Sequence, residues 1–254
     1  TVLHAGGKFS NEGGYKTAGG LHGVGASVVN ALSKWCEVEV CRDKKRYRMR
    51  FENGGKKIGK LEELGSSNKT GSKVTFMPDD TIFSTTTFNF NTICERAQEE
   101  AFLLEGVKIV VKDYIHNEES EFHYENGLLA FMNYLHEDKD VLHEPVIFSG
   151  ESNGINIKCA FQYTDGYQEN TFSYVNLVRT KDGGTHEVGY KTAFTKTIND
   201  YARNNGLLKE KDKNFEGSDV REGLTSIIVV TIPQDLLQFE GQTKGKLGTP
   251  IAKT

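Results

Sequence analysis

The sequence predicts an α+β protein in which antiparallel strands and helices follow one another through two successive domains. Short runs that alternate polar and apolar residues, such as "CEVEVCR" and "INIKCAFQY", are typical of half-buried strands. Apolar residues at helical spacing predict helices between these runs. Near residue 126 the pattern restarts with a new helix. We therefore place a domain boundary there, which divides the chain into residues 1–126 and 127–254.

The first domain is expected to hold an antiparallel sheet with helices on one side. Val28, Val29 and Leu32 recur at helical spacing, so we expect a helix over Ala26–Lys34. The runs "CEVEVCR" and "YRMRF" predict a hairpin, and a second pair of strands is expected to flank the polar loop "GSSNKTG". A helix over Asn91–Leu103 and the strands "VKIVV" and "EFHY" complete this half.

The second domain is expected to open with the helix "GLLAFMNYL". The alternating runs "INIKCAFQY" and "TFSYVNLV" predict two strands, and "TSIIVVTI" predicts a third, strongly β-branched one. A long helix over Thr185–Asn204 follows the segment "RTKDGG". That segment suits either a turn that caps this helix or a loop that faces DNA, and we favour the turn.

Composition and charge exclude several classes of protein. The 31 Lys and Arg against 35 Asp and Glu give a net charge of -4, which argues against a chain whose whole surface grips DNA or acidic lipid. The four cysteines lack zinc-site spacing, so reduced thiols are expected. The sequence shows no signal peptide or membrane span. We expect a cytoplasmic protein without a membrane partner, and the opening "TVLHAGG" reads as the tail of an element begun earlier in a longer protein.

A glycine-rich stretch, "GGLHGVG", stands directly before the first helix. Glycines at Gly20, Gly23 and Gly25 would let backbone N–H groups and the positive end of the helix dipole meet a phosphate. A flexible surface loop is the alternative that the glycines alone leave open. The order G-x-x-G-x-G without a preceding strand differs from the dinucleotide fingerprint, and "GQTKGK" lacks the spacing of a Walker loop.

Longer motifs carry a resemblance to a known family. The stretch "YKTAGGLHGVGASVVNAL" resembles the ATP lid and phosphate-binding motif of GHKL ATPases, in the form found in bacterial type IIA topoisomerase B subunits. The blocks "HAGGKF", "RTKDGGTHE", "NDYAR", "REGL" and "QFEGQTK" are similar to the same subunits in the same order. Of the two branches of that family, "VRTKDGGTHE" and "VTFMPDDTIF" resemble the topoisomerase IV branch more than the gyrase branch.

The resemblance implies a fold and a set of nucleotide contacts. Residues 1–126 would be the C-terminal part of a GHKL (Bergerat) ATPase domain with its ATP lid, and residues 127–254 a transducer domain of ribosomal S5-like fold. ATP and Mg²⁺ would be the cofactors. The residues implied to bind the nucleotide are Tyr15, Gly19, Gly20, Leu21, His22, Gly23, Val24, Gly25, Ala26 and Ser72. Among them, Tyr15 would act from inside the lid, His22 would shape the loop or contact phosphate, and Ser72 would lie near the adenine.

Lys244 and Gln242, in the block "QTK", are the implied catalytic residues. By the resemblance, Lys244 reaches from the second domain to the γ-phosphate, and Gln242 helps to fix that phosphate. A solvated surface lysine is the alternative for such a position. No metal ligand is assigned, because the family's catalytic glutamate, its Mg²⁺-binding asparagine and its adenine-reading aspartate would lie upstream. We therefore expect the 254-residue chain alone to bind ATP weakly and to hydrolyse it hardly at all.

The resemblance also implies a function for the whole protein. ATP binding and hydrolysis would drive dimer closure and the passage of one DNA duplex through another, giving decatenation and relaxation. The implied partners are the topoisomerase A subunit, a second copy of the chain held through the ATPase region as a homodimer, and double-stranded DNA. The alternatives are gyrase B with ATP-dependent negative supercoiling, a GHKL ATPase of chaperone or mismatch-repair type, and a non-enzymatic interaction module in which the glycine stretch is a linker.

Overall fold

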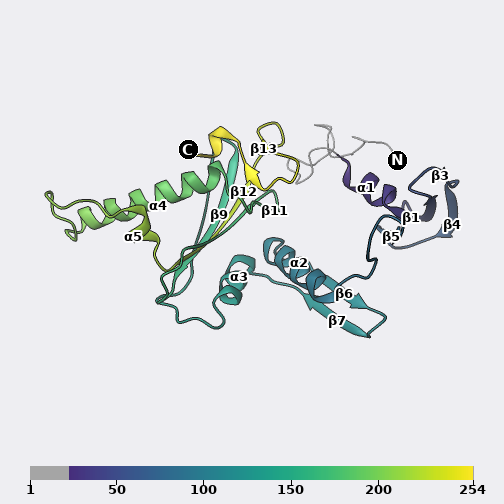
Figure 1. Ribbon diagram of the computed structural model, residues 1–254, viewed down its shortest axis with the longest axis horizontal. Coiled ribbons are helices and arrows are strands. Elements are labelled where there is room, and N and C mark those ends of the chain that lie inside the picture. The colour runs from purple at the N-terminus through teal and green to yellow at the C-terminus, as the bar shows by residue number, and fades with distance from the viewer. Residues whose placement is uncertain (1–22, 254) are drawn as a thin grey trace. The chain divides into compact units, whose positions relative to one another are not determined.

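The structure, a computed structural model, describes residues 23–253. They form two compact units, residues 23–89 and residues 90–253 (Figure 1). Both units combine helices with sheets that are largely antiparallel, so the predicted α+β class is confirmed. The domain boundary near residue 126 concerns the division of the whole protein and stays a prediction.

The first unit is a five-stranded antiparallel sheet with one helix. Its elements are α1 (Gly25–Ala31), β1 (Ser33–Arg42), β2 (Lys45–Glu52), β3 (Lys57–Ile58), β4 (Glu62–Ser66) and β5 (Gly71–Pro78). The strand order is β3-β2-β1-β5, and β4 pairs with β2. The predicted hairpin is confirmed as β1–β2, with Val38 opposite Met49. Asp43 and Lys44 both have positive φ, as the two-residue turns of tight hairpins require.

Two expectations for this unit are wrong. The first helix ends at Ala31, and Ser33 already begins β1, where its hydroxyl donates to the Val29 carbonyl at 2.6 Å. The strands that flank "GSSNKTG" do not pair with each other, because β4 joins β2 whereas β5 joins β1. Local alternation identifies a strand, but the choice of its neighbour depends on contacts across the sheet.

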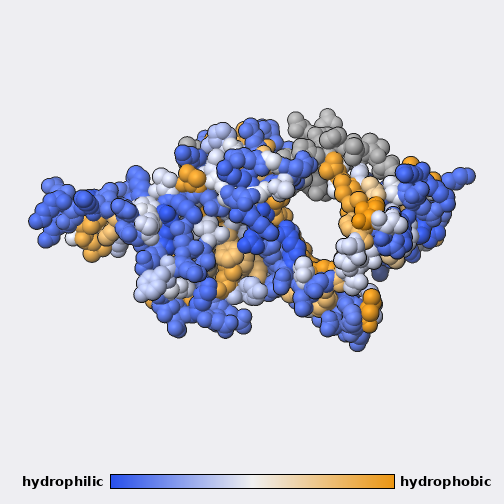
Figure 2. Space-filling model, viewed as in Figure 1, coloured by the Kyte–Doolittle hydropathy of each residue, from blue (hydrophilic) through white to orange (hydrophobic). Residues whose placement is uncertain are grey.

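An apolar surface covers the α1 side of the first unit. Val28 is 47 % exposed and Val74 is 57 % exposed. Val28, Leu32, Phe76 and Phe83 are among the residues that line a hollow of about 230 Å³. Figure 2 shows hydrophobic residues gathered over α1. A continuous apolar patch of this kind is typical of a surface that contacts another element or another protein.

The second unit is built on a second five-stranded sheet. Its elements are α2 (Phe90–Leu103), β6 (Ile109–Asp113), β7 (Glu118–Phe122), α3 (Gly127–Leu135), β8 (Val146–Ser152), β9 (Ile155–Tyr163), β10 (Asn170–Val175), β11 (Val178–Arg179), α4 (Thr185–Asn204), α5 (Gly217–Arg221), β12 (Leu224–Thr231), β13 (Phe239–Glu240), β14 (Lys246–Leu247) and a 3₁₀ turn (Pro250–Lys253). The sheet order is β11-β10-β12-β9-β8, in which β10 and β12 run parallel and the other neighbours run antiparallel.

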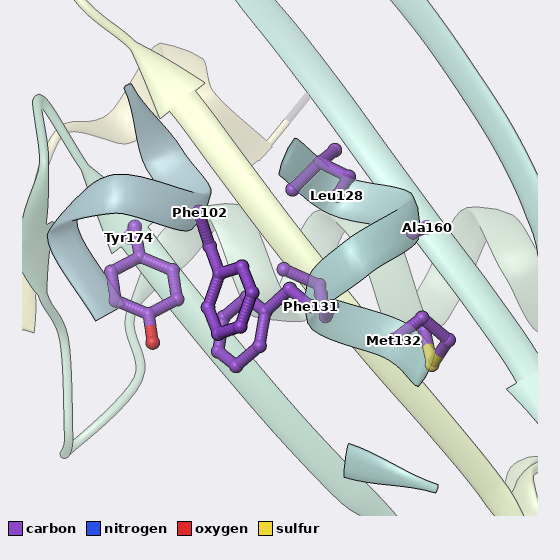
Figure 3. Close-up of a cluster of buried hydrophobic side chains, with 7 residues drawn as sticks. Phe102, Leu128, Phe131, Met132, Ala160 and Tyr174 are labelled. Atoms are coloured by element: carbon purple, nitrogen blue, oxygen red, sulfur yellow. The ribbon is translucent and has the colours of Figure 1, made fainter. Parts of the chain in front are cut away.

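Helices cover both faces of this sheet. Alternate residues of β12 point to opposite faces. Ile227 joins the buried cluster that includes Phe131 of α3, whereas the Ser226 hydroxyl lies 3.0 Å from the Tyr190 hydroxyl of α4. The cluster consists of Phe102, Leu128, Phe131, Met132, Ala160, Tyr174 and Ile227, six of which Figure 3 labels. Helices α2 and α3 thus cover one face of the sheet, and α4 covers the other.

The long helix predicted over Thr185–Asn204 is confirmed as α4. The single strand predicted at "TFSYVNLV" is wrong, because Asn176 and Leu177 have φ of 49° and 67° and turn the chain from β10 into β11. The Asn176 side chain accepts from the Ile232 N–H at 2.8 Å and donates to the Ile232 carbonyl at 2.9 Å. This pair of hydrogen bonds to a distant segment stabilises a left-handed turn that a leucine would not favour alone.

Candidate nucleotide site

The described part of the glycine stretch leads directly into α1. Gly23 has φ of 58°, in the left-handed region that glycine adopts without strain. Val24 is the residue at the helix N-cap, and its side chain makes no capping hydrogen bond. Among residues 23–253, no atom lies within 4 Å of the place that a Cβ on Gly25 would take. Gly23–Ala26 thus form a left-handed turn that opens a helix, and their role in holding a phosphate stays a prediction.

The rest of the predicted loop lies outside the described residues. This applies to Tyr15, Gly19, Gly20, Leu21 and His22. Their assignment to the nucleotide stays a prediction, and so does the choice between a phosphate loop and a linker.

Ser72 lies near the start of β5, opposite Val40 of β1. Its side chain is exposed. Because side chains alternate along a strand, Ser72 shares a face with Val74 and Phe76. Phe76 lines the hollow beside α1, so this face is the one on which α1 lies. The structure thus places Ser72 on the same side of the sheet as α1, the helix that follows the glycine loop.

Lys244 and Gln242 lie in the loop that joins β13 to β14. Gln242 is exposed and Lys244 is half-buried. Lys244 has φ of 57°, and Gly241 before it has φ of 89°. Partial burial lowers the pKa of Lys244, because desolvation disfavours the ammonium. The ammonium of Lys244 is therefore partly dehydrated, unlike that of a fully solvated lysine.

The glycine loop and Lys244 belong to different units of the structure. That both loops contact a single triphosphate stays a prediction.

The structure also shows residues that the sequence analysis did not assign to the site. The turn before α4 donates the Asp182 N–H to the Gly245 carbonyl at 2.8 Å, and its Gly183 carbonyl accepts from the Leu247 N–H at 3.0 Å. For "RTKDGG" we favour a helix-capping turn, and the structure shows a turn whose last residue, Gly184, is the N-cap of α4 without a side-chain capping hydrogen bond. The feature of the sequence that could have indicated this contact is the pair Gly183–Gly184, because glycine lets two backbone segments lie close together.

The described residues contain no disulfide, no metal-binding cluster and no helix that could span a membrane. The four cysteines are free, which confirms the prediction of unpaired thiols. Across residues 23–253, no cluster of three or more His, Cys, Asp or Glu side chains is placed to hold a metal ion. None of the helices in that range combines the length and apolar character needed to cross a bilayer.

Comparison with known proteins identifies the family. A sequence model described as DNA gyrase B matches residues 127–254, which is half of the chain. The chain belongs to the DNA gyrase B family. Within this family, it is 62 % identical over 257 residues to the DNA topoisomerase 4 B subunit of Enterococcus faecalis and 61 % identical over 254 residues to that of Bacillus subtilis. Both alignments cover 100 % of this chain but 37 % and 39 % of the relatives, so the chain spans well under half of their length.

Solved structures of the DNA gyrase B family are similar over most of the chain. The 43K ATPase domain of Thermus thermophilus gyrase B, solved with an aminocoumarin, is 39 % identical with a TM-score of 0.77, over 91 % of this chain and 62 % of that one. The topoisomerase IV ATP-binding domain of Francisella tularensis, solved with a small-molecule inhibitor, is 31 % identical with a TM-score of 0.76, over 99 % and 66 %. These similarities agree with the GHKL ATPase and transducer folds expected from the sequence.

Proposed function

We propose that this chain is the ATP-binding and transducer part of a type IIA DNA topoisomerase B subunit of the topoisomerase IV type. The observation that carries the proposal is the identity of about 60 % to topoisomerase 4 B subunits along the whole chain. In this function, ATP binding and hydrolysis by the protein drive dimer closure and DNA strand passage, with decatenation and relaxation as the outcome.

The first unit supplies the nucleotide-binding part of this proposal. Backbone N–H groups of residues 20–26 bind the triphosphate. Tyr15 contacts the nucleotide from inside the lid, His22 shapes the loop or contacts phosphate, and Ser72 lies near the adenine. The left-handed Gly23 and the open backbone at Gly25 support this assignment. The apolar surface over α1 also supports it, because the remainder of an ATPase domain would cover that surface.

The second unit supplies the cation. Lys244 contacts the γ-phosphate, and Gln242 helps to fix it. An ammonium in a partly dehydrated place stabilises the charge that spreads over the transferred phosphoryl group. Because the lysine and the phosphate loop lie in different units, ATP bridges the units and hydrolysis releases the bridge. Mg²⁺ acts with ATP, and we assign no residue of this chain to hold it.

The proposed partners follow from this function. They are a topoisomerase A subunit, a second copy of this protein held through the ATPase region, and double-stranded DNA, in the cytoplasm. Gyrase B is the second candidate, because the matching family model and the Thermus thermophilus structure carry that name. The complete enzyme, assembled with its A subunit, separates the two. Topoisomerase IV decatenates linked circles, whereas gyrase introduces negative supercoils into a relaxed plasmid.

Replacing Lys244 with alanine in the full-length protein is expected to lower the kcat of ATP hydrolysis by about 10²–10³-fold, which is typical when one preorganised charge-stabilising group is lost. Steady-state ATPase assays measure this change. The binding of a non-hydrolysable ATP analogue is expected to weaken far less, because the loop amides and the adenine contacts remain.

Lys246→Ala is the matched control for this experiment. Lys246 lies two positions further on, is the first residue of β14, is exposed, and pairs with Glu240 of β13 at 3.0 Å. Its removal should leave kcat near that of the wild type. If the Lys244→Ala variant kept a kcat within about threefold of the wild type, or if both variants lost activity equally, the assigned role of Lys244 would be wrong.

A further inference from the structure

The loop that carries Lys244 is attached to the turn at residues 180–184. The Asp182 N–H donates to the Gly245 carbonyl at 2.8 Å, and the Leu247 N–H donates to the Gly183 carbonyl at 3.0 Å. Gly184 and Leu247 form a parallel bridge. Lys244 is the direct neighbour of Gly245, so its backbone position follows that of this turn.

Further hydrogen bonds join the same loop to the first residue of α4. The Thr185 hydroxyl donates to the Thr249 carbonyl at 2.7 Å. The Thr249 hydroxyl in turn donates to the Leu236 carbonyl and accepts from the Gln238 N–H, each at 2.9 Å. Both ends of the segment that contains β13, Lys244 and β14 are therefore connected to the start of α4.

The turn is itself held by buried polar groups beneath it. The Thr180 hydroxyl donates to the Ser173 carbonyl at 3.1 Å, and Nε2 of His186 lies 3.1 Å from the same hydroxyl oxygen. Ser173 also donates to the carboxylate of Glu187. Ser173, Thr180 and His186 are each 2 % exposed. Hydrogen bonds in so dry a place are costly to break, so the turn has little freedom to shift.

Two glycines allow the turn and the Lys244 loop to lie closer than side chains would permit. Gly184 has φ of 143°, and a Cβ there would lie 2.4 Å from the Leu247 carbonyl oxygen and 2.6 Å from its nitrogen. A Cβ on Gly245 would lie 2.3 Å from a carboxylate oxygen of Asp182. At Gly184 the contact is therefore with the backbone of Leu247, which cannot rotate away as a side chain can.

We propose that the turn at residues 180–184 positions Lys244 for the γ-phosphate and links that lysine to the N-terminal end of α4. Gly184 and Gly245 are positioning residues, since they act on the phosphate through Lys244. A movement of Lys244 that keeps these hydrogen bonds carries the start of α4 with it. The inference rests on the proposed function, because it uses the assigned role of Lys244.

Gly184→Ala in the full-length protein tests the proposal. We expect kcat for ATP hydrolysis to fall by about 10²-fold, since a misplacement near 1 Å is enough for such a loss. The dissociation constant of a non-hydrolysable ATP analogue should change by less than about threefold, because the first unit is untouched. Gly65→Ala is the control: Gly65 also has a positive φ, 121°, but a Cβ there would meet nothing within 4 Å.

A double variant separates positioning from general damage. If Gly184 acts through Lys244, then adding Gly184→Ala to Lys244→Ala should cause no further loss of kcat. An additional loss, or a folded Gly184→Ala variant with wild-type kcat, would overturn the inference. A wild-type kcat for Lys244→Ala alone would instead overturn the proposed function, so the two failures are distinguishable.

If the Gly184→Ala variant does not fold, Gly245→Ala tests the same proposal. The φ of Gly245 lies outside the left-handed region, so alanine there adds contact with the Asp182 carboxylate without backbone strain. Because the Asp182 carboxylate can rotate away from a Cβ at 245, we expect Gly245→Ala to lower kcat by less than Gly184→Ala does. The Asp182→Ala/Gly245→Ala pair should recover the loss, because alanine at 182 removes the carboxylate and keeps the N–H. Equal loss in the single and the paired variant would contradict the proposed contact.

Discussion

Replacing Phe131 with alanine is expected to lower the free energy of unfolding of the second unit by about 3–5 kcal/mol, the range for large aromatic side chains truncated in a core. Phe131 is 4 % exposed. Its ring stacks on that of Phe102, with centroids 4.8 Å apart and planes 6° from parallel (Figure 3). It also makes tilted contacts with Phe172 and Tyr174 of β10. Truncation would remove the ring that joins α2, α3 and the sheet.

Urea unfolding followed by far-UV circular dichroism measures this loss, because α2, α3, α4 and α5 all lie in the second unit. The single tryptophan, Trp35, lies in the first unit, and its fluorescence therefore reports on that unit alone. Tyr114→Ala is the matched control, since this ring is 89 % exposed in the β6–β7 turn. A loss below about 1 kcal/mol for Phe131→Ala would show that α2 and α3 repack without it.

Acidification is expected to destabilise the second unit between about pH 6.5 and pH 4. Burial lowers the pKa of His186 to about 4, because desolvation disfavours the imidazolium. In this interval the unfolded chain binds a proton at His186 and the folded chain does not, so stability falls as the pH falls. The difference between a pKa of about 6.5 in the unfolded chain and about 4 in the folded chain corresponds to about 3 kcal/mol.

A second buried histidine acts in the same direction. Burial also lowers the pKa of His136. Its two ring nitrogens lie 2.7 Å from Gln162 Oε1 and 2.8 Å from Thr225 Oγ1. His116, by contrast, is exposed beside Asp113, which raises its pKa, so this histidine does not contribute to acid destabilisation.

His186→Gln tests the assignment, because glutamine does not titrate in this range. Urea unfolding at several pH values, followed by the helix signal, should show a shallower loss of stability below pH 6.5 than in the wild type. His116→Gln should keep the wild-type dependence. Identical pH profiles for His186→Gln and the wild type would mean that the imidazole of His186 becomes charged without leaving the core.

Local patterns were sufficient for elements whose periodicity is continuous. Helix α4 has the bounds that its apolar spacing predicts, and the β1–β2 hairpin follows from two alternating runs around a polar turn. The first helix was predicted too long, because Ser33 and Lys34 suit either a helix end or a strand start. The edge strand β8 was not predicted, since it is exposed along its whole length and so lacks a buried face to show alternation.

In the candidate site too, some residues were predicted from local motifs and others were found only in the structure. The glycine stretch and "QTK" were recognisable as motifs because their chemistry is carried by consecutive residues. Asp182 and Gly184 were assigned only to a turn, since their contact with Gly245 and Leu247 joins segments that are far apart in the sequence. No periodicity within either segment indicates such a contact.

The sequence by itself determined the α+β class, the extent of α4, the glycine loop before α1 and the family of the protein. The tertiary structure decided which strands pair, where "TFSYVNLV" breaks into β10 and β11, and that the Lys244 loop lies against the turn at 180–184. Periodicity reports the environment of neighbouring residues, and it therefore predicts an element's type and length. Partners are chosen by long-range hydrogen bonds and close packing, such as those of Asn176 with Ile232 and of Gly184 with Leu247, and these form only when the whole unit folds.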